Sequence, residues 1–492
     1  MKIAVIGAGP GGLAASMLLA NKGFDVTVYE REEKVGGRNA RIQEQGYTFD
    51  IGPTFFLMPF VLEDIFEQTG RKLADYVDMQ LVSPNYQLVF GDGSKLFPDN
   101  DPDKTKQAIK ALVPGDEDGY DRYMKDNDKK MDRALSALQK PYTHAYDVLR
   151  PEVLKLTPYL KPWKSLWDEL GDYYSDDRVK LSFTFQSKYL GMSPYTCPSM
   201  FSIICFSEYK WGIHHVMGGL NQLSEAMAKA FKEDGGKLVL GKEVKEIEIT
   251  KGKATGLVFE DGIEKFDEII MNADFAGGLK QLIPDAKRKK YSDENLNKKK
   301  YSCSTFMIYL GLDKIFDELE HHNIFISEDY NKNFKEIEEL KTISRDPSFY
   351  VHNPSRMDKS LAPKGHSALY ILVPITNMKS GTKWEKEKKK YRQLILEKLK
   401  EKAGIPDLEE HIKYEKIITP EDWEKEYHVG YGATFNLAHN LGQMLLFRPH
   451  NDFEEFENMW LVGGGTHPGS GLPTIYESGR ITAGMIEKKH TT

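Results

Sequence analysis

The glycines that follow the first apolar run of the chain have the spacing of a dinucleotide-binding turn. In "VIGAGPGG", Gly7 permits a tight turn, Gly9 lets backbone amides approach a pyrophosphate, and Gly12 lets the next helix pack close to the strand. Glu30 follows at the distance where a carboxylate binds the hydroxyl pair of a ribose. These residues predict that the chain binds a dinucleotide through its pyrophosphate and one ribose.

The elements needed to position those residues occur in the required order. Residues 2–6 are a continuous apolar run, which is typical of a strand buried on both faces. Residues 13–23 carry apolar side chains at helical spacing and end at a glycine that suits a helix C-cap. Residues 25–30 predict a second strand with the acid at its carboxyl end. Together they predict a Rossmann-like α/β domain.

A second glycine turn distinguishes between the dinucleotides. Gly36, Gly37 and Arg38 come shortly after the acid, in "EREEKVGGRNARI". A nicotinamide domain has no need for a further turn and a cation at this place, whereas an FAD bound along its own domain extends past the first turn. Arg38 is then expected to meet phosphate or flavin oxygens. The sequence therefore predicts FAD as the cofactor.

Composition narrows the class of protein. With 492 residues the chain is too long for one core, so two or more domains are expected. The net charge of −7 argues against nucleic acid as a partner. Three scattered cysteines are expected to be free thiols and to form no metal site. No apolar run is long enough to span a bilayer, and the amino-terminal run is interrupted by glycines, so we expect a cytoplasmic protein.

Two longer motifs show which family the chain resembles. "GGRNARIQEQGYTFDIGPTFFLMP" and "LVGGGTHPGSGLPTIYESGRITAGMI" resemble the flavin motifs of the bacterial carotenoid (phytoene-type) desaturases, within the flavin amine oxidase-like superfamily. "VMGGLNQLSEAMAKAFKEDGGKLVLGKEVKEIEI" resembles the segment that completes their cofactor domain. The resemblance implies further FAD contacts at Gly52, Pro53, Thr54, Val244, Gly465, Thr466, Gly471, Leu472 and Pro473. The helix beginning at the last three is expected to point its N-terminus at the flavin ring.

Three shorter segments, "YSCSTFMIYLGLD", "DKSLAPKGHSALYILVP" and "FGDGSKLFPDN", resemble the subgroup of 4,4'-diapophytoene (dehydrosqualene) desaturases. This implies an FAD-dependent oxidoreductase of carotenoid biosynthesis that acts on CH–CH groups. Such an enzyme is expected to convert 4,4'-diapophytoene to 4,4'-diaponeurosporene by hydride transfer to flavin. The carbocation left by hydride loss gives up its proton readily, so no strongly tuned base is expected. His467 is a candidate polar group at the flavin, and Glu208 a candidate in the substrate channel.

The domain organisation is expected to be discontinuous. Residues 1–90, 213–295 and 455–492 are expected to form the FAD-binding domain. Residues 91–212 are expected to form a substrate- and membrane-associating insertion, and residues 296–454 a substrate domain, together of α+β type. There is no second glycine-rich strand–turn–helix for a nicotinamide cofactor. Oxygen or a membrane quinone is therefore the expected electron acceptor.

An apolar substrate favours contact with a membrane. A thirty-carbon polyene is held in a bilayer by roughly 0.8 kcal/mol per buried CH₂, so its enzyme must draw it from lipid. Residues 148–170 interleave leucines and tryptophans with lysines and arginine, a composition that suits a membrane interface. We expect this segment, together with residues 54–66, to dock the protein on the cytoplasmic membrane as a peripheral protein.

Three alternatives remain open at this stage. An oxidase of the terminal methyl groups of a diapocarotenoid shares the FAD motifs and the apolar channel. A phytoene desaturase for forty-carbon substrates differs in substrate length. A prenyl-lipid chaperone of the GDP-dissociation-inhibitor type shares the fold and performs no redox chemistry, but such proteins lack the intact flavin motifs that this chain has at both ends.

Overall fold

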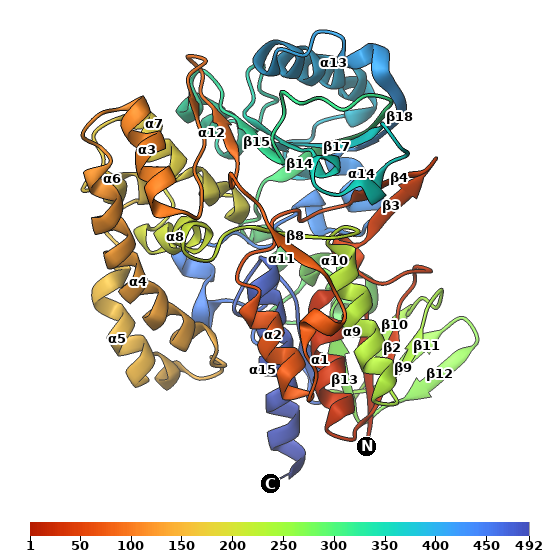
Figure 1. Ribbon diagram of the computed structural model, residues 1–492. Helices are drawn as coiled ribbons and strands as arrows, with labels where there is room; N and C mark the ends of the chain where they lie inside the picture. The colour runs from red at the N-terminus through yellow and green to blue at the C-terminus, as the bar shows by residue number, and fades with distance from the viewer. Residues whose placement is uncertain (492) are drawn as a thin grey trace.

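A five-stranded parallel sheet forms the base of the molecule in the computed structural model, which describes residues 1–491 (Figure 1). Its strand order is β19 (Met459–Leu461), β13 (Glu268–Met271), β1 (Lys2–Ile6), β2 (Asp25–Tyr29) and β9 (Lys237–Val239). All neighbouring strands run parallel. The five strands come from three distant parts of the chain, so the sheet closes only when those parts meet.

The two faces of this sheet are covered differently, because successive side chains of a strand point to opposite faces. Ile3 and Val5 of β1 pack among four helices. These helices are α1 (Pro10–Asn21), α2 (Phe60–Gln68), α9 (Asn221–Glu233) and α15 (Leu472–Thr491). Ala4 and Ile6 pack instead against an antiparallel meander. The meander consists of β10 (Glu246–Thr250), β11 (Lys253–Phe259) and β12 (Gly262–Lys265).

A second, seven-stranded sheet lies at the opposite end of the molecule. Its order is β18 (Ile412–Ile418), β14 (Ser304–Leu312), β17 (Ser367–Ile375), β16 (Phe349–His352), β15 (His322–Phe325), β6 (Gln87–Val89) and β7 (Lys95–Leu96). The long helix α13 (Trp384–Ala403) covers one face through Trp384, Tyr391 and Ile395. The hairpin of β3 (Arg41–Glu44) and β4 (Tyr47–Asp50) packs on the other face.

Helices form a third part, on the left of Figure 1, with a core of their own. They are α3 (Pro102–Leu112), α4 (Asp118–Leu138), α5 (Pro151–Leu160), α6 (Leu166–Leu170), α7 (Asp177–Ser182) and α8 (Ser202–Trp211). The remaining α-helices and strands are β5 (Met79–Leu81), β8 (His214–Val216), α10 (Phe275–Leu282), α11 (Asp293–Lys298), α12 (Tyr330–Glu338) and α14 (Pro420–Lys425). The strands β5 and β8 pair with each other in the middle of the molecule.

The expected α/β class, with an α+β insertion beside a Rossmann-like sheet, is confirmed by this arrangement. The expected domain boundaries stay a prediction; β6, within residues 1–90, pairs with β15 of the second sheet. All three cysteines are unpaired thiols, as expected. Among residues 1–491, no helix combines the length and apolar character that crossing a membrane requires.

Candidate functional site

One cavity of about 850 Å³ joins the three parts of the molecule. At one end it is lined by the turns that follow β1, β2 and β13, at the carboxyl edge of the parallel sheet. At the other end it is lined by side chains of α4, α8 and β15. The carboxyl edge of a parallel α/β sheet is where such folds bind ligands. Backbone groups therefore dominate one end of the cavity and apolar side chains the other.

Glu30 is fixed at the sheet end of the cavity. It is 7% exposed, and its two carboxylate oxygens accept hydrogen bonds from the backbone N–H of Ala8 (2.7 Å) and Glu32 (3.0 Å). Each oxygen keeps a further lone pair for a ligand hydroxyl. Gly7 adopts φ +96°, which makes the turn that brings Ala8 to this carboxylate. The carboxylate is thus held in place to bind a ribose.

Gly12 shapes the site without lining it. A Cβ atom at this position would lie 2.5 Å from the carbonyl oxygen of Gly7 and 2.7 Å from Nδ2 of Asn272. The close approach of α1 to β1 therefore requires glycine. Asn272, which follows β13, donates from Nδ2 to the carbonyl oxygen of Gly7 (2.9 Å) and to that of Gly9 (3.3 Å). Sequence reasoning missed this asparagine, which stands in "MNAD" at the end of a recognised strand.

The second glycine turn packs against the Gly52 turn. Gly36 and Gly37 both adopt positive φ, +117° and +54°. A Cβ at Gly52 would lie 2.5 Å from the carbonyl oxygen of Arg38, so glycine is required there too. Gly37, Arg38 and Gly52 line the cavity, as do Pro53 and Thr54. The two turns at the ends of the segment "GGRNARIQEQGYTFDIGPT" therefore meet in the structure.

Arg38 is held at the cavity wall by two acceptors. Its Nη1 donates to the carbonyl oxygen of Thr434 (2.8 Å) and lies 3.8 Å from Oδ2 of Asp274. Burial raises the pKa of the Asp274 carboxyl, and the guanidinium of Arg38 opposes that rise. About 30% of the Arg38 side chain remains exposed, so it keeps donors for a ligand.

The carboxyl-terminal motif completes the sheet end. Gly463, Gly464 and Gly465 line the cavity, and so do Gly471, Leu472 and Pro473 at the N-terminus of α15. Thr466 does not line it; its Oγ1 donates to the carbonyl oxygen of Pro449 (2.5 Å). The unpaired N–H groups of a helix N-terminus favour negative charge. This end of the cavity therefore offers a second helix N-terminus beside that of α1.

His467 lies behind this motif rather than in the cavity lining. Its Nε2 lies 3.2 Å from the carbonyl oxygen of Leu138, and its ring packs edge-on against Tyr142. Burial lowers the pKa of His467 to about 3, so the ring is neutral. In the structure this histidine joins the turn to the end of α4.

The sheet end fits FAD. Gly9 and Gly37 line it with backbone alone, and Val244, which the resemblance implied as an FAD contact, also lines the cavity. Oγ1 of Thr434, a lining residue, is buried without a hydrogen-bond partner in the protein. Buried polar atoms are normally paired, so this hydroxyl suits contact with a bound polar ligand.

The other end of the cavity is apolar. Its lining includes Met131 and Leu135 of α4, Ile203 and Ile204 of α8, and Ile324 of β15. These residues belong to segments far apart in the sequence, so no short sequence motif predicts that they line one pocket. A surface of this kind binds a hydrocarbon by excluding water from it.

A hydrogen-bonded chain runs from the lining into the protein. The hydroxyl of Thr54 lies 2.9 Å from that of Tyr350, which lies 2.6 Å from Nδ1 of His322. The ring of Phe55 stacks on His322 with centroids 4.2 Å apart. Burial lowers the pKa of His322 well below its usual range, so the ring is neutral. The "GPTF" segment thus meets the seven-stranded sheet through polar and aromatic contacts.

Glu208 lies one layer behind the lining, on α8. It is fully buried and accepts hydrogen bonds from Nε2 of Gln186 (2.8 Å) and the hydroxyl of Tyr86 (3.2 Å). Burial raises the pKa of Glu208 to about 8, so the carboxyl is protonated at neutral pH. The residue that lines the cavity nearby is Ser207.

Lys188 is a cation in the lining that sequence reasoning missed. Its Nζ lies 4.7 Å from the ring centroid of Tyr330 and 5.0 Å from that of Phe334. Burial lowers the pKa of Lys188 to about 7, so the amine exchanges a proton near neutral pH. No local pattern marks this lysine, because its surroundings come from α12, far along the chain.

Comparison with known proteins adds to this geometry. A family described as flavin-containing amine oxidoreductase matches residues 10–486. A 4,4'-diapophytoene desaturase (4,4'-diapolycopene-forming) of a Methylomonas species is 45% identical, over 99% of this chain and 95% of that protein. A 4,4'-diapophytoene desaturase (4,4'-diaponeurosporene-forming) of Staphylococcus aureus strain Newman is 34% identical, over 99% of both chains. The crystal structure of an oxidoreductase from Methanosarcina mazei shares the fold, with a TM-score of 0.63, 18% identity, and 99% and 100% of the two chains covered.

Proposed function

The chain belongs to the flavin-containing amine oxidoreductase family, among its carotenoid desaturases, and we propose that it introduces double bonds into 4,4'-diapophytoene. Its cofactor is FAD. The observation that carries the substrate proposal is that one continuous cavity extends from the glycine turns into an apolar pocket between α4, α8 and β15. A linear hydrocarbon lying in that pocket reaches the cofactor end without crossing water.

The protein residues hold the two reactants and exclude solvent. Glu30 and the N-terminus of α1 are placed to hold the ribose and pyrophosphate of FAD, and the start of α15 lies beside the start of α1. FAD, when bound, supplies an acceptor for the hydride that leaves the substrate. Each double bond also releases one proton. Lys188 is the lining group whose pKa, about 7, suits it to take up a proton near neutral pH.

Expression in a bacterial host that makes 4,4'-diapophytoene tests the proposal. The pigments are separated by chromatography, and their masses are measured by mass spectrometry. We expect products lighter than the substrate by pairs of hydrogen atoms, and the number of pairs counts the desaturation steps. The two relatives named above differ in the product they form, and we propose 4,4'-diaponeurosporene for this chain. An unchanged substrate, with an oxygenated product only when diaponeurosporene is supplied, would assign the chain to the methyl oxidases instead.

The same proposal requires access to lipid, and the structure offers one surface for it. Five apolar side chains of this region are exposed, and together we call them the docking surface: Tyr146, Leu149, Leu154, Trp163 and Phe447. Leu149 and Phe447 lie on the short helices Ala145–Leu149 and Leu445–Phe447, which contact each other. Met444, three residues before Phe447, lines the apolar end of the cavity. The docking surface and the cavity therefore share one segment of chain, which suits uptake of substrate from lipid.

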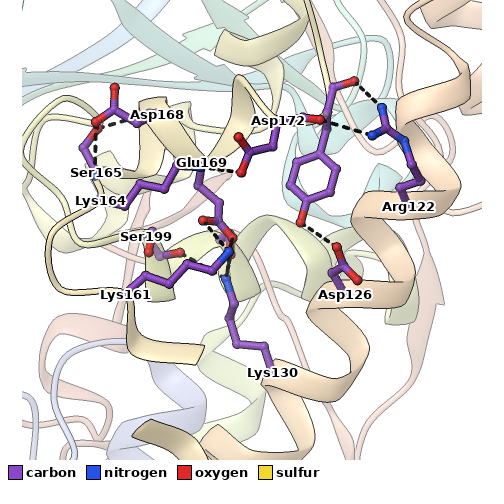
Figure 2. A network of polar contacts seen from close by, with 12 residues as sticks. Arg122, Asp126, Lys130, Lys161, Lys164, Ser165, Asp168, Glu169, Asp172 and Ser199 are labelled. Carbon is purple, nitrogen blue, oxygen red and sulfur yellow. Dashed lines mark hydrogen bonds and ion pairs between the residues drawn. The ribbon is translucent and has the colours of Figure 1, made fainter. Parts of the chain in front are cut away.

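A buried ion-pair network holds this surface to the body of the protein. Figure 2 shows Lys130 of α4 and Lys161 at the end of α5 both directed at Glu169 of α6. Glu169 is 1% exposed and accepts from Lys161 at 3.0 and 3.1 Å. The loop that presents Trp163, which is 83% exposed, lies between Lys161 and α6. The network fixes both ends of that loop, so Trp163 is held outward.

Residues 54–66 do not belong to this surface, contrary to the expectation from sequence. Phe56, Ile65 and Phe66 are fully buried in the core between the parallel sheet and the helices α1, α2, α9 and α15. Their apolar run serves the packing of α2 between α1 and α15. Phe55 and Leu57 line the cavity instead.

Flotation with phosphatidylglycerol–phosphatidylcholine vesicles tests the membrane proposal. We expect the full-length protein to float with vesicles, and the triple variant Leu149→Ser, Trp163→Ser, Phe447→Ser to remain in the dense fraction with its flavin still bound. A wild-type protein that stays entirely in the dense fraction would refute peripheral membrane association. We further propose that electrons leave the enzyme to oxygen or to a membrane quinone, which turnover under argon, with and without added quinone, distinguishes.

A further inference from the structure

Four buried histidines meet outside the cavity, where β8 approaches β15 and β16. His215 lies in β8, His321 directly precedes β15, His322 begins that strand, and His352 ends β16. None of the four is more than 3% exposed. One ring nitrogen of each of His215, His321 and His352 lies within 4.8 Å of the other two. We call these three residues the histidine cluster.

The protein's own hydrogen bonds leave this cluster incomplete. The two Nε2 atoms of His321 and His352 face each other at 3.1 Å, and at most one of them carries the proton of a hydrogen bond between them. Nδ1 of His215 and Nδ1 of His321 are buried without any partner in the protein. Leaving a buried ring nitrogen without a partner is energetically costly, because the nitrogen has lost its hydrogen bond to water. One bound ion can engage Nδ1 of His215 together with the facing Nε2 atoms of His321 and His352, but it cannot also engage Nδ1 of His321.

Acidic residues next to the cluster match the surroundings of a bound cation. Oδ2 of Asp358 lies 3.4 Å from Nε2 of His215 and also accepts from the N–H of Gly218 (2.6 Å). A metal-binding histidine commonly donates its second N–H to a carboxylate in this manner, which turns its other nitrogen toward the metal. That other nitrogen is the unpartnered Nδ1 of His215. Asp50, a second buried acid, interacts electrostatically with His215.

We propose that His215, His321 and His352 bind one divalent transition-metal ion of the Zn²⁺ type. Three neutral imidazoles are the ligand set that Zn²⁺ takes in sites with one open position. With Zn–N bonds of about 2.1 Å, tetrahedral ligands stand about 3.4 Å apart. The pair at 3.1 Å is close to that spacing, and the third ring, whose nitrogen lies within 4.8 Å of the other two, closes on it with a side-chain movement of at most about 1.4 Å.

The ion would join two parts of the protein that backbone hydrogen bonds do not join at this point. β8 pairs with β5, whereas β15 and β16 belong to the seven-stranded sheet. His322, beside the cluster, bonds to Tyr350 of the cavity wall. The site therefore links the segment after α8 to the strands behind the substrate pocket, independently of which polyene the enzyme accepts.

Metal analysis of the full-length, FAD-loaded protein tests the proposal. Protein from cells grown with added Zn²⁺ is expected to retain about one equivalent of metal after gel filtration. After removal with a chelator, addition of Co²⁺ alone is expected to give the visible absorption of a low-coordinate site with nitrogen ligands. His352→Ala is expected to lose both signals. His144→Ala, which removes an exposed histidine on another part of the chain, is expected to keep them.

The wild-type measurements decide the matter even if variants of the cluster fold poorly. A metal content below about a tenth of an equivalent, with no Co²⁺ absorption, would overturn the proposal and assign the cluster to buried water. Unchanged metal binding by a folded His352→Ala variant would overturn it equally. Flavin content and pigment formation are measured on the same preparations. A failure of the metal site is thereby distinguished from a failure of the desaturase assignment.

Discussion

The two ends of the cavity are built by different means. At the sheet end, backbone amides, glycines of positive φ and one carboxylate form the surface, and they come from short motifs of the chain. At the apolar end, side chains from α4, α8, β15 and the short helix Phe185–Leu190 form it, and each segment contributes only one or a few. The shape of the sheet end depends on the path of the backbone. The shape of the apolar end depends on which side chains the fold brings together.

The sharpest test of the backbone-built end is Gly12→Ala. The added Cβ meets the carbonyl oxygen of Gly7 at 2.5 Å, so α1 must move away from β1 and carry its N-terminus out of position. Strain of about 3 kcal/mol corresponds to a roughly 100-fold weaker affinity for FAD. Flavin absorbance per protein after gel filtration measures it.

Gly484→Ala is the matched control for this substitution. Gly484 also lies in a helix, α15, and an added Cβ would meet no atom within 4 Å. We expect normal flavin content and a slight gain in stability, because alanine is the better helix former. Normal flavin in Gly12→Ala would show that the first turn does not hold the cofactor.

A substitution in the apolar end separates it from the cofactor end. Ile204→Trp fills part of the pocket beside α8, and overpacking of about 2 kcal/mol lowers kcat/KM for the polyene roughly 30-fold. Flavin content is expected to stay at the wild-type level. The measurement is pigment formation by purified enzyme with substrate in vesicles.

Ile204→Leu conserves the volume and is expected to retain most of the activity. Equal activity of the tryptophan and leucine variants would place the polyene elsewhere. Loss of flavin in the tryptophan variant would show that the two ends of the cavity are not independent.

The docking surface is expected to give a smaller effect. Removing the Trp163 indole by Trp163→Ala forfeits about 1.5 kcal/mol of interfacial burial, which corresponds to roughly 10-fold weaker binding to vesicles. Ile263→Ala, on the exposed strand β12 of the cofactor side, is expected to change nothing. Flotation at increasing lipid concentration compares the two variants. A reversed order of effects would move the membrane contact to the opposite side of the molecule.

A separate prediction concerns the buried carboxyl behind the apolar end. Burial raises the pKa of Glu208 from 4.5 to about 8, so between these values the unfolded chain releases a proton that the folded chain keeps. The free energy of unfolding therefore falls as pH rises through this window, by about 1 kcal/mol per pH unit from this group. Glu208→Gln keeps an acceptor for Gln186 and is expected to remove that slope. Urea denaturation at pH 6 and pH 8 measures it, and equal slopes would show that Glu208 is ionised in the folded protein.

The same contrast explains how much the sequence predicts. The order of strand, turn, helix, strand and acid predicts β1 to β2 and the position of Glu30, because glycine spacing and apolar periodicity are local properties. The sequence does not predict that Thr466 and His467 face away from the cavity, since their neighbours Pro449 and Leu138 come from other segments. Lys188 and Asn272 escape notice for the same reason: their roles arise from tertiary contacts.

The burial of residues 54–66 is a further feature that the sequence alone does not predict. Their apolar composition alone is equally consistent with a membrane contact and with a core helix. Only the packing of α2 against α1 and α15 assigns Phe66 and Ile65 to the core. By contrast, α5 ends at Lys161, and Trp163 in the loop that follows is exposed and does not pack in a core.

Anaerobic single turnover tests the central claim most directly, namely that one cavity brings an apolar polyene to the bound flavin. FAD-loaded enzyme is mixed with 4,4'-diapophytoene in vesicles under argon, and flavin absorbance and product mass are followed together. The account predicts that oxidised-flavin absorbance disappears in proportion to a product lighter by two hydrogen atoms. Flavin that stays oxidised while the product forms, or a product formed only after oxygen is admitted and carrying oxygen, would contradict it.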